Sequence, residues 1–483
     1  MFSLFKKETA TPDFPPVKLF NTETRTLEEF VPLSDNDVKI YSCGPTVYDY
    51  AHIGNLRAYV FADTLKRVLQ YNGYTVNHTI NLTDFGHLTD DADAGDDKMM
   101  KGLRREGMDI SLESMRLLSD RYIKAFEDDF EELNILFPTQ FSRASDYVAE
   151  QIALIATLEQ KGYTYKTSDG LYFDISKFPT YGRLGNIDID GLRSGARVEV
   201  NNEKRHPADF AVWKNGELGW ESIWGKGFPG WHIECSAMAF ATLGKQIDIH
   251  TGGIDNIPTH HNGEIAQCES ATSKQFSKYW MHGEHLQIDN QKIAKSDGNG
   301  ITIHTLVEKG FSGTEYRYWL LTSHYRSKVN FNFEALQGAK QALTRLKKLL
   351  FVEWAKERGI LHLGYQQKFI ESINNDLNTA QAIALIWDIA KDESLTAGDR
   401  KMTIIEFDRV LGLGLSADAE EILRSLGRLT STDIPEKIKE YINQREAARV
   451  AQNWQEADKL RDAIIYAGYA IEDGPQGPRI TKS

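Results

Sequence analysis

A strand, a helix and a second strand follow one another between residues 38 and 82, and this order constrains the fold more than any other feature. The first strand is the run Val-Lys-Ile-Tyr-Ser-Cys at 38–43. Apolar residues then recur at helical spacing from Leu56 to Leu69, and Gly73 follows where helices commonly end. Residues 74–82 are rich in β-branched side chains, which favour a strand. Such a βαβ unit predicts the α/β fold class.

Beyond this unit the pattern of apolar residues changes along the chain. Residues 110–165 are predicted to be helical, and 166–230 mix short strands and turns in the manner of an inserted module. The α/β pattern returns at 233–288, where we expect a helix at 260–272. The remainder is mostly helical, and its charged stretch at 436–466 is predicted to form one helix.

Composition restricts the class of protein. The net charge of −13 argues against binding nucleic acid through bulk positive charge, although it permits a local basic track. The sequence has no run of about 18 apolar residues and no apolar stretch behind its first lysines, so we expect a cytoplasmic protein without a membrane span. The three cysteines, Cys43, Cys235 and Cys268, are too few for a disulfide framework.

The tetrapeptide His52-Ile-Gly-Asn55 lies between the first strand and the first helix. Free backbone N–H groups at a helix N-terminus attract anions. Gly54 permits close approach of a nucleotide, and both His52 and Asn55 can donate hydrogen bonds to phosphate oxygens. A chance tetrapeptide in a tight turn is the alternative.

A second motif, Lys292-Ile-Ala-Lys295-Ser296, lies in a polar loop that follows a predicted strand. Its two lysines can clamp a polyphosphate and neutralise the charge that builds on a leaving pyrophosphate. A solvated surface loop is the alternative for this motif taken alone.

Four residues form a candidate metal site. His260 and Glu264 are four apart on a predicted helix, so their side chains share a face. Cys43 ends the first strand, and Cys235 begins the returning α/β part. Two thiolates, an imidazole and a carboxylate suit Zn²⁺. Because the cysteines are distant in sequence and form no CxxC motif, two ordinary buried cysteines are the alternative.

Taken together, the two phosphate motifs resemble the HIGH and KMSKS signatures of class I aminoacyl-tRNA synthetases. They occur in the same order, each after a predicted strand. Asn55 stands in place of the last histidine, and Ile293 and Ala294 replace the Met-Ser centre of the second signature.

Three longer blocks are similar to cysteinyl-tRNA synthetases in particular, and the similarity runs over nearly the whole chain. The blocks are Tyr-Ser-Cys-Gly-Pro-Thr-Val-Tyr-Asp at 41–49, Pro-Gly-Trp-His-Ile-Glu-Cys-Ser-Ala-Met at 229–238 and His-His-Asn-Gly-Glu-Ile-Ala-Gln at 260–267. An acidic stretch at 85–97 is longer than the family's usual run at this point.

The resemblance implies one zinc ion, which selects the substrate thiolate over the hydroxyl of serine. The implied zinc ligands are Cys43, Cys235, His260 and Glu264. The implied pocket residues are Thr83, Trp231, His250 and Asp255. His261 is expected to point off the metal-facing side and Cys268 to be a small buried residue, while Thr251 stands where the family often has glycine.

The implied reaction activates L-cysteine with ATP, with Mg²⁺ on the phosphates, and transfers cysteine to tRNA(Cys). The residues implied to act in catalysis are His52, Asn55, Lys292, Lys295 and Ser296. Those implied to bind ATP are His52, Gly54, Asn55 and Lys295. We expect the chain to act as a monomer.

The same resemblance implies three parts of the chain. A Rossmann-type catalytic domain at 20–300 contains an inserted connective module at about 110–230. A stem-contact region and helical bundle, which includes the motif Asp376-Leu-Asn-Thr-Ala, covers 301–415. An anticodon-binding region covers 430–483, where Trp454 and Tyr469 are candidates for stacking on unpaired bases. For Trp454 we favour a role as a hydrophobic-core anchor.

Three other functions are compatible with parts of this pattern. A cysteine:amino-sugar ligase of the mycothiol type shares the core and the zinc but resembles a shortened chain, which the segment 430–483 argues against. A non-catalytic paralogue that binds tRNA or cysteine would not need the two signature lysines. A different nucleotidyl transferase of the superfamily would not need the zinc ligands. Cysteine-dependent pyrophosphate exchange separates an enzyme from a binding protein.

Overall fold

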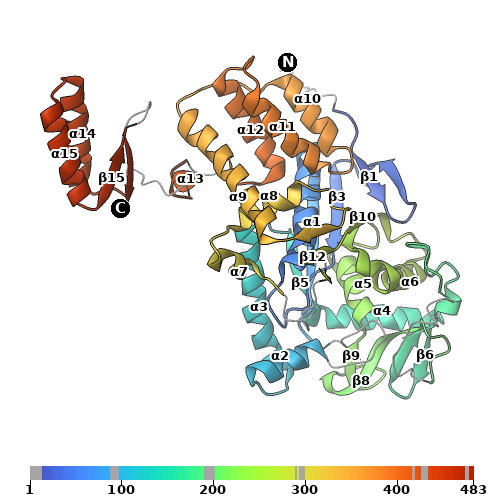
Figure 1. Cartoon of the computed structure of the whole chain (residues 1–483). Coiled ribbons are helices and arrows are strands. Elements are labelled where there is room, and N and C mark those ends of the chain that lie inside the picture. The colour runs from blue at the N-terminus through green and yellow to red at the C-terminus, as the bar shows by residue number, and fades with distance from the viewer. Residues whose placement is uncertain are drawn as a thin grey trace, which may run out of the picture. The chain divides into compact units, whose positions relative to one another are not determined.

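Five parallel strands form the main sheet of the computed structural model (Figure 1). In sheet order they are β11 (Ser277–Gly283), β10 (Ile247–Gly253), β3 (Asp37–Ser42), β4 (Thr75–Leu82) and β5 (Gln140–Arg143). The helix α1 (Ile53–Tyr71) connects β3 to β4 and packs against β4, β10 and β11. Gly73 follows α1 with a φ of +91°, a conformation that favours glycine. The predicted α/β fold class is confirmed.

The structure describes residues 14–86, 97–189, 202–288, 291–292, 300–415, 419–425, 433–473 and 478–482. The chain divides into two units. The first comprises Met1–Leu336, Leu363–Asp388 and Arg409–Leu413, and the second comprises Gln337–His362, Ile389–Asp408 and Gly414–Ser483.

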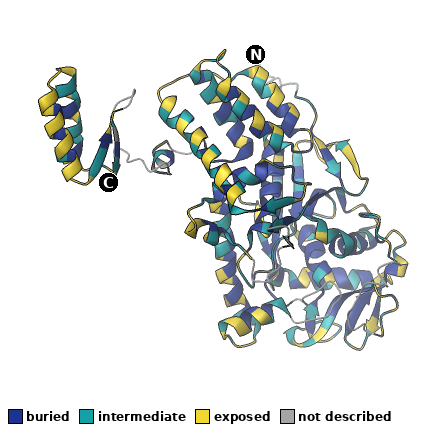
Figure 2. Cartoon of the chain, in the orientation of Figure 1, coloured by how far each residue is buried: buried dark blue, intermediate teal, exposed yellow. Residues whose placement is uncertain are grey.

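The central strands of the main sheet are buried along almost their whole length (Figure 2). Burial of this kind is typical of a parallel sheet that helices cover on both faces. The strands β3 and β4 run in register from Asp37 opposite Thr75 to Ser42 opposite Ile80. The carboxyl ends of β3, β4 and β10 therefore meet at one edge, where open α/β sheets bind ligands.

A second, antiparallel sheet lies between β5 and β10 in the sequence. Its order is β6 (Thr164–Thr167), β7 (Gly170–Phe173), β8 (Phe210–Trp220) and β9 (Gly227–Pro229). The helices α4 (Val148–Gln160) and α5 (Trp231–Thr242) pack on it and share an apolar core that includes Ile155, Phe173 and Trp213.

The stretch 110–165 is not wholly helical, and that expectation was wrong in part. It contains α3 (Leu112–Glu132) and α4, but also β5, a 3₁₀ turn at Ala144–Tyr147 and the start of β6. Residues 140–143 become a strand because β4 offers them an open sheet edge, a tertiary contact that overrides local preference.

A third sheet follows the main one and contains Lys292, the first residue of the second phosphate motif. It consists of β12 (Leu286–Ile288), the short β13 (Gln291–Lys292) and β14 (Val329–Phe331), in the order β13-β12-β14. The helices α7 (Ile303–Glu308) and α8 (Gly313–Leu321) lie between β13 and β14 in the sequence.

The remaining elements complete the two units. Near the N-terminus, β1 (Lys18–Asn21) pairs with β2 (Thr26–Glu29), and α2 (Lys98–Glu106) precedes α3. The later helices are α9 (Phe333–Lys348), α10 (Leu363–Ile373), α11 (Thr379–Lys391), α12 (Ala397–Leu411) and α13 (Ala419–Ser425), with a π-helical turn at Leu349–Glu353. Within the described residues, no helix is long and apolar enough to cross a membrane.

The charged stretch at 436–466 forms two helices rather than one. The helix α14 (Glu436–Val450) ends before Gln452, whose φ of +57° reverses the chain into α15 (Trp454–Tyr466). Ile464 packs with residues of β15 (Tyr469–Glu472) and β16 (Arg479–Lys482) in a small core. Trp454 is 58% exposed, so its interpretation as a core anchor was wrong. Tyr469 packs against that core.

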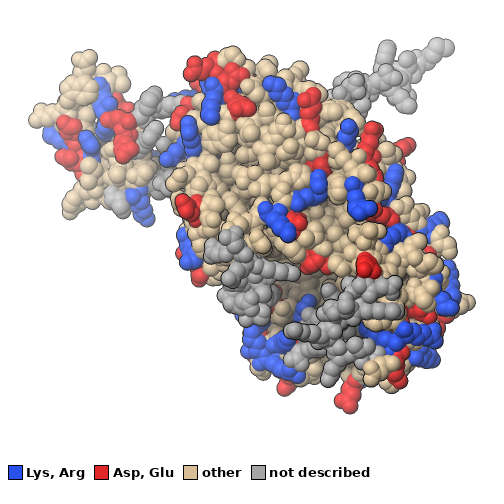
Figure 3. All heavy atoms as spheres, turned by 45° about the vertical axis from the view of Figure 1, so that its right-hand side comes forward, with Lys and Arg blue, Asp and Glu red and all other residues tan. Residues whose placement is uncertain are grey.

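Acidic and basic side chains are interspersed on the face of the molecule that Figure 3 draws.

Candidate active site

A cavity of about 390 Å³ lies at the carboxyl edge of the main sheet. One part of its wall comes from the segment after β3 and the N-terminus of α1, and another from α5 and the segment after β10. The sequence-predicted residues among those that line it are Cys43, His52, Gly54, Asn55, Thr83, Trp231, Cys235, Asp255 and His260.

The four predicted zinc ligands come together, and three of them, Cys43, Cys235 and His260, line this cavity. One donor atom each from Cys43, Cys235, His260 and Glu264 lies within 4.8 Å of the others. Cys43 directly follows β3, where its backbone N–H donates to the carbonyl of Thr251 in β10 at 3.2 Å. Cys235 belongs to α5, and Glu264 belongs to α6 (Asn262–Thr272). The sequence left this convergence open, and the parallel pairing of β3 with β10 produces it.

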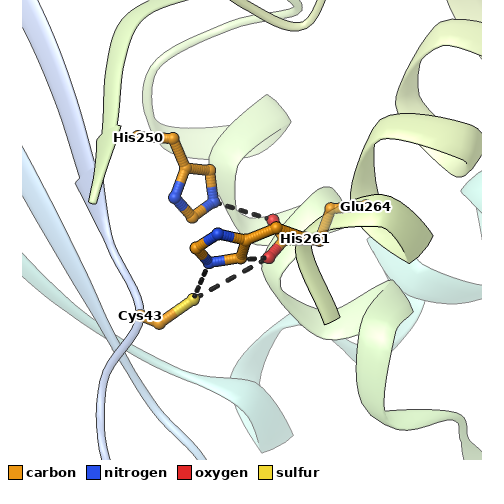
Figure 4. A group of neighbouring side chains, drawn as sticks. All are labelled: Cys43, His250, His261 and Glu264. Carbon is orange, nitrogen blue, oxygen red and sulfur yellow. Dashed lines mark hydrogen bonds and ion pairs between the residues drawn. The ribbon is translucent and has the colours of Figure 1, made fainter. Parts of the chain in front are cut away.

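A second set of donors overlaps the first, as Figure 4 shows. It keeps Cys43 and Glu264 and adds His250 from β10 and His261, whose Nε2 lies 3.2 Å from the Cys43 sulfur. The expectation that His261 points away was therefore wrong. Residues Ile257–His261 form a π-helical turn rather than an α-helix. The α-helical rule that residues four apart share a face therefore does not apply to this turn, and it does not place His260 and His261 on different faces.

Further histidines orient these donors. His261 Nδ1 lies 2.8 Å from His282 Nε2, and His282 Nδ1 lies 2.8 Å from the hydroxyl of Thr22. His232 Nδ1 lies 3.1 Å from His260 Nδ1. Hydrogen bonds of this kind fix the ring orientation of metal-binding histidines. His282, near the carboxyl end of β11, was not among the site residues chosen from the sequence.

A glycine makes room for one of these rings. A Cβ atom at Gly252 would lie 2.7 Å from the ring of His261, closer than side chains tolerate.

The hydroxyl of Thr251 lies 2.6 Å from the hydroxyl of Ser42, which in turn lies 2.8 Å from His78 Nε2. The side chain of Thr251 is thus buried beneath the cavity rather than directed into it.

The electrostatics of the set favour an ionised Glu264 beside a protonated His260. Burial would raise the pKa of Glu264, but the charge of His250 and hydrogen bonds from His250 and His260 lower it to about 2. Burial would lower the pKa of His260, but Cys235 and Glu264 raise it to about 10.

The two thiols of the set behave differently. Burial raises the pKa of Cys43 well above its usual value, and the hydrogen bond with Cys235 adds to the rise. Burial also acts to raise the pKa of Cys235, yet hydrogen bonding with Cys43 and the charge of His260 lower it. Cys235 is therefore the thiol that ionises first, and thiolates are the form that binds metal.

The N-terminus of α1 forms another part of the cavity wall. His52 and Asn55 make a reciprocal cap: His52 Nδ1 accepts from the Asn55 backbone N–H at 3.1 Å, and Asn55 Oδ1 accepts from the His52 backbone N–H at 3.4 Å. Such a capping box fixes the start of a helix. Of the second motif, Lys292 lies in β13, and Lys295 and Ser296 lie outside the described residues.

The predicted pocket residues take different positions. The Trp231 ring lies 4.5 Å from that of His260, between centroids, and the Thr83 hydroxyl donates to Glu234 at 2.9 Å. His250 is fully buried, is absent from the described cavity wall, and directs Nε2 to Glu264 at 2.9 Å. The structure thus places His250 beside Glu264, a predicted zinc ligand, rather than in the cavity wall.

Comparisons with known proteins identify the family. The family model described as the catalytic domain of class I (C) tRNA synthetases matches residues 29–341, and a DALR domain matches 368–395. The curated cysteine–tRNA ligase 1 of Burkholderia lata is 45% identical over 96% of this chain and 97% of its own length.

The chain belongs to the cysteine–tRNA ligase family of class I synthetases. It is therefore an enzyme, as the sequence predicted. Two further ligases of the family, from Treponema denticola and Chlamydia trachomatis, are each 40% identical to it. They cover 95% and 96% of this chain, over 98% and 99% of their own lengths.

Solved structures agree on the fold of this cysteine–tRNA ligase family member. The methionyl-tRNA synthetase of Mycobacterium tuberculosis in complex with methionyl-adenylate superposes with a TM-score of 0.54 at 14% identity. The match covers 82% of this chain and 95% of the other. At this identity the likeness supports the class I fold alone.

Proposed function

We propose that this chain activates L-cysteine with ATP and transfers it to tRNA(Cys), and that Zn²⁺ selects the substrate thiolate. One observation carries the proposal. A largely buried set of two sulfurs, an imidazole and a carboxylate reaches the wall of a cavity that the capped N-terminus of α1 also lines. The donor set suits a soft thiolate, and the helix N-terminus suits a phosphate.

The residues present fit a zinc ion. Cys43, Cys235, His260 and Glu264 supply sulfur, nitrogen and oxygen donors of the types that bind Zn²⁺. Zinc bound there would supply a Lewis acid that takes a thiolate and discriminates against the hydroxyl of serine. The surrounding histidines hold the donors in place, so the ion meets a preformed site.

The other residues of the cavity bind and orient the substrates. His52 and Asn55 donate hydrogen bonds to phosphate oxygens, and Gly54 admits the nucleotide. Thr83 and Trp231 enclose the amino acid, and Asp255 lies on the adenylate side. Lys292, Lys295 and Ser296 hold the triphosphate, with Mg²⁺ on its oxygens.

The first step is a transfer at phosphorus and the second is an acyl transfer, and both depend on the positioning of the reacting groups. In the first, a carboxylate oxygen of cysteine attacks the α-phosphorus of ATP, a P–O bond forms and pyrophosphate leaves. In the second, the 2′-hydroxyl of the tRNA terminal adenosine attacks the acyl carbon of cysteinyl-AMP, loses its proton and displaces AMP.

Two assays test the proposal. Purified protein should catalyse ATP–pyrophosphate exchange with L-cysteine. The exchange rate with L-serine should be at least about 100-fold lower, a ratio that a simple pocket does not reach for such similar side chains. It should then charge purified tRNA(Cys). Exchange without charging, together with transfer to an amino sugar, would favour the mycothiol-type ligase. Cysteine binding without exchange would favour a non-catalytic paralogue.

A further inference from the structure

The segment 324–327, between α8 and β14, contacts two buried charged side chains. One is Arg57 of α1, and the other is Asp376, from the turn between α10 and α11. Arg57 is 6% exposed and Asp376 is 4% exposed, so both charges are held almost entirely by protein groups.

Arg57 binds five backbone carbonyls. Its Nη1 donates to Glu284 at 2.6 Å and His285 at 2.7 Å. Its Nη2 donates to the carbonyls of residues 324, 325 and 327, the shortest being 2.6 Å to Ser327. The guanidinium thus joins α1 to two separate segments. A planar fork with five donors is the side chain that can do this, and lysine cannot.

Asp376 binds side chains of the same segment, whereas Arg57 binds its backbone. Its Oδ1 accepts from the Tyr325 hydroxyl at 2.7 Å and from the Phe20 backbone N–H at 2.9 Å. Its Oδ2 accepts from Arg326 Nε at 2.8 Å, and its carbonyl lies 2.8 Å from His324 Nε2.

The backbone at this turn is in an unfavourable conformation. Asp376 has a φ of +54° and the next residue, Leu377, has a φ of +56°. Such left-handed conformations are unfavourable for residues other than glycine, and they persist where surrounding contacts enforce them. The four hydrogen bonds of Asp376 to residues 20 and 324–326 supply those contacts.

The segment that these charges hold forms part of the cavity wall. Tyr325 lines the cavity, stacks on Phe61 with ring centroids 4.3 Å apart, and its carbonyl also accepts from the Glu284 backbone N–H at 2.9 Å. Residues 284–286 line the cavity as well, and they lead through β12 into β13, which contains Lys292.

We propose that Arg57 and Asp376 are paired positioning residues for adenylate formation. Through their hydrogen bonds to residues 324–327, they fix the position of the cavity wall beside the N-terminus of α1. They also fix the start of the hairpin that contains Lys292. This inference rests on the proposed function, because it takes this part of the cavity to bind ATP. The inference assigns the Asp376-Leu-Asn-Thr motif a role in adenylate formation, a reaction that needs no tRNA.

The variants Arg57→Lys and Asp376→Asn test the proposal in zinc-loaded full-length protein. We expect kcat of cysteine-dependent ATP–pyrophosphate exchange to fall about 10- to 100-fold in each, since small displacements of reacting groups cost rates of this size. The KM for cysteine and the zinc content should stay within about twofold, because the metal-binding set is untouched. The double variant should lose less than the product of the two effects, because both act through one segment.

A control and a milder variant make the result decisive. Asp399→Asn removes a carboxylate that accepts from the Ile360 backbone N–H in the second unit, and it should leave exchange unchanged. If Asp376→Asn does not fold, Tyr325→Phe removes one hydroxyl of the same link and should still slow exchange.

Three results would overturn the proposal. They are normal exchange rates in both single variants, loss confined to the charging of tRNA, and a matching rise in the KM for cysteine. A wild-type protein that shows no cysteine-dependent exchange would instead refute the proposed function.

Discussion

His250 Nε2 lies 2.9 Å from Glu264 Oε2, and both side chains are fully buried. The contact joins β10 of the main sheet to α6, the helix that carries one of the proposed zinc ligands. The other carboxylate oxygen, Oε1, lies 3.1 Å from His260 Nε2. Each oxygen of Glu264 thus has its own partner, and the carboxylate is oriented before any cation binds.

We expect His250→Ala to weaken zinc binding about 10- to 100-fold, the usual effect of removing a hydrogen-bond partner of a metal ligand. Competition with a chromogenic chelator measures this affinity. His250→Gln keeps an N–H donor and should recover most of the loss. Equal zinc affinity in wild type and His250→Ala would contradict this role.

Cys235→Ala should abolish both stoichiometric zinc binding and cysteine-dependent pyrophosphate exchange, because it removes the thiol that ionises first. The matched control is Cys268→Ala. Cys268 is equally buried and lies one turn from Glu264 on α6, but it belongs to neither donor set. That control should keep zinc and exchange and lose only about 1 kcal/mol of stability through the smaller side chain. Zinc retained by Cys235→Ala would refute the proposed site.

Asn55 serves both the helix cap and the proposed phosphate contact, and two substitutions separate these roles. Asn55→Asp keeps an oxygen that can accept from the His52 backbone N–H, and a negative charge suits a helix N-terminus, so the melting temperature should not fall. The carboxylate should nevertheless repel phosphate and lower kcat/KM for ATP by about 100-fold or more. Asn55→Ala should lose about 1 kcal/mol of stability as well as activity. Wild-type ATP kinetics in Asn55→Asp would exclude the phosphate contact.

Asp129 makes stability depend on pH. Burial raises its pKa from 3.8 to about 7, with the charges of Asp128 and Glu132 adding to the rise. The folded state therefore binds more protons than the unfolded state between pH 4 and 7, and the free energy of unfolding falls as pH rises through this range. Asp129→Asn should be more stable than wild type at pH 8 by about 1 to 2 kcal/mol, allowing for partial solvent screening, and equal to it near pH 4.

Urea denaturation at the two pH values measures this difference. Asp120→Asn on the same helix is the control, because Asp120 is 54% exposed and forms an ion pair with Arg143. It should not stabilise the protein at pH 8. A gain from Asp129→Asn that is the same at both pH values would contradict the assignment.

Trp454 should contact tRNA, because its ring is 58% exposed and a guanidinium, that of Arg449, lies 5.9 Å from its centroid. Stacking of a base on an exposed aromatic ring is worth about 1–3 kcal/mol. Trp454→Ala should thus raise the KM for tRNA by about 10-fold and leave tRNA-independent exchange unchanged. Val450→Ala, a change at an 87% exposed site without a ring, should affect neither.

Much of this protein could be predicted from its sequence, because the relevant signals are local. The βαβ order at residues 38–82, the capped glycine-containing turn at 52–55 and the similarity of three longer blocks each lie within short stretches. These stretches predicted the α/β class and the family, and both predictions were confirmed. The four proposed zinc ligands were also chosen from the sequence. That their side chains come together could not be predicted from it.

Only the tertiary structure decided which distant side chains meet. Parallel pairing of β3 with β10 brings Cys43 to Thr251, and the π-helical turn before α6 directs His260 and His261 to the same carboxylate. Packing between separate segments likewise decides the exposure of Trp454. It also decides the hydrogen bonds that Arg57 and Asp376 form with residues 324–327. Sequence periodicity reports which face of one element is apolar, whereas these contacts depend on the register and backbone geometry of several elements at once.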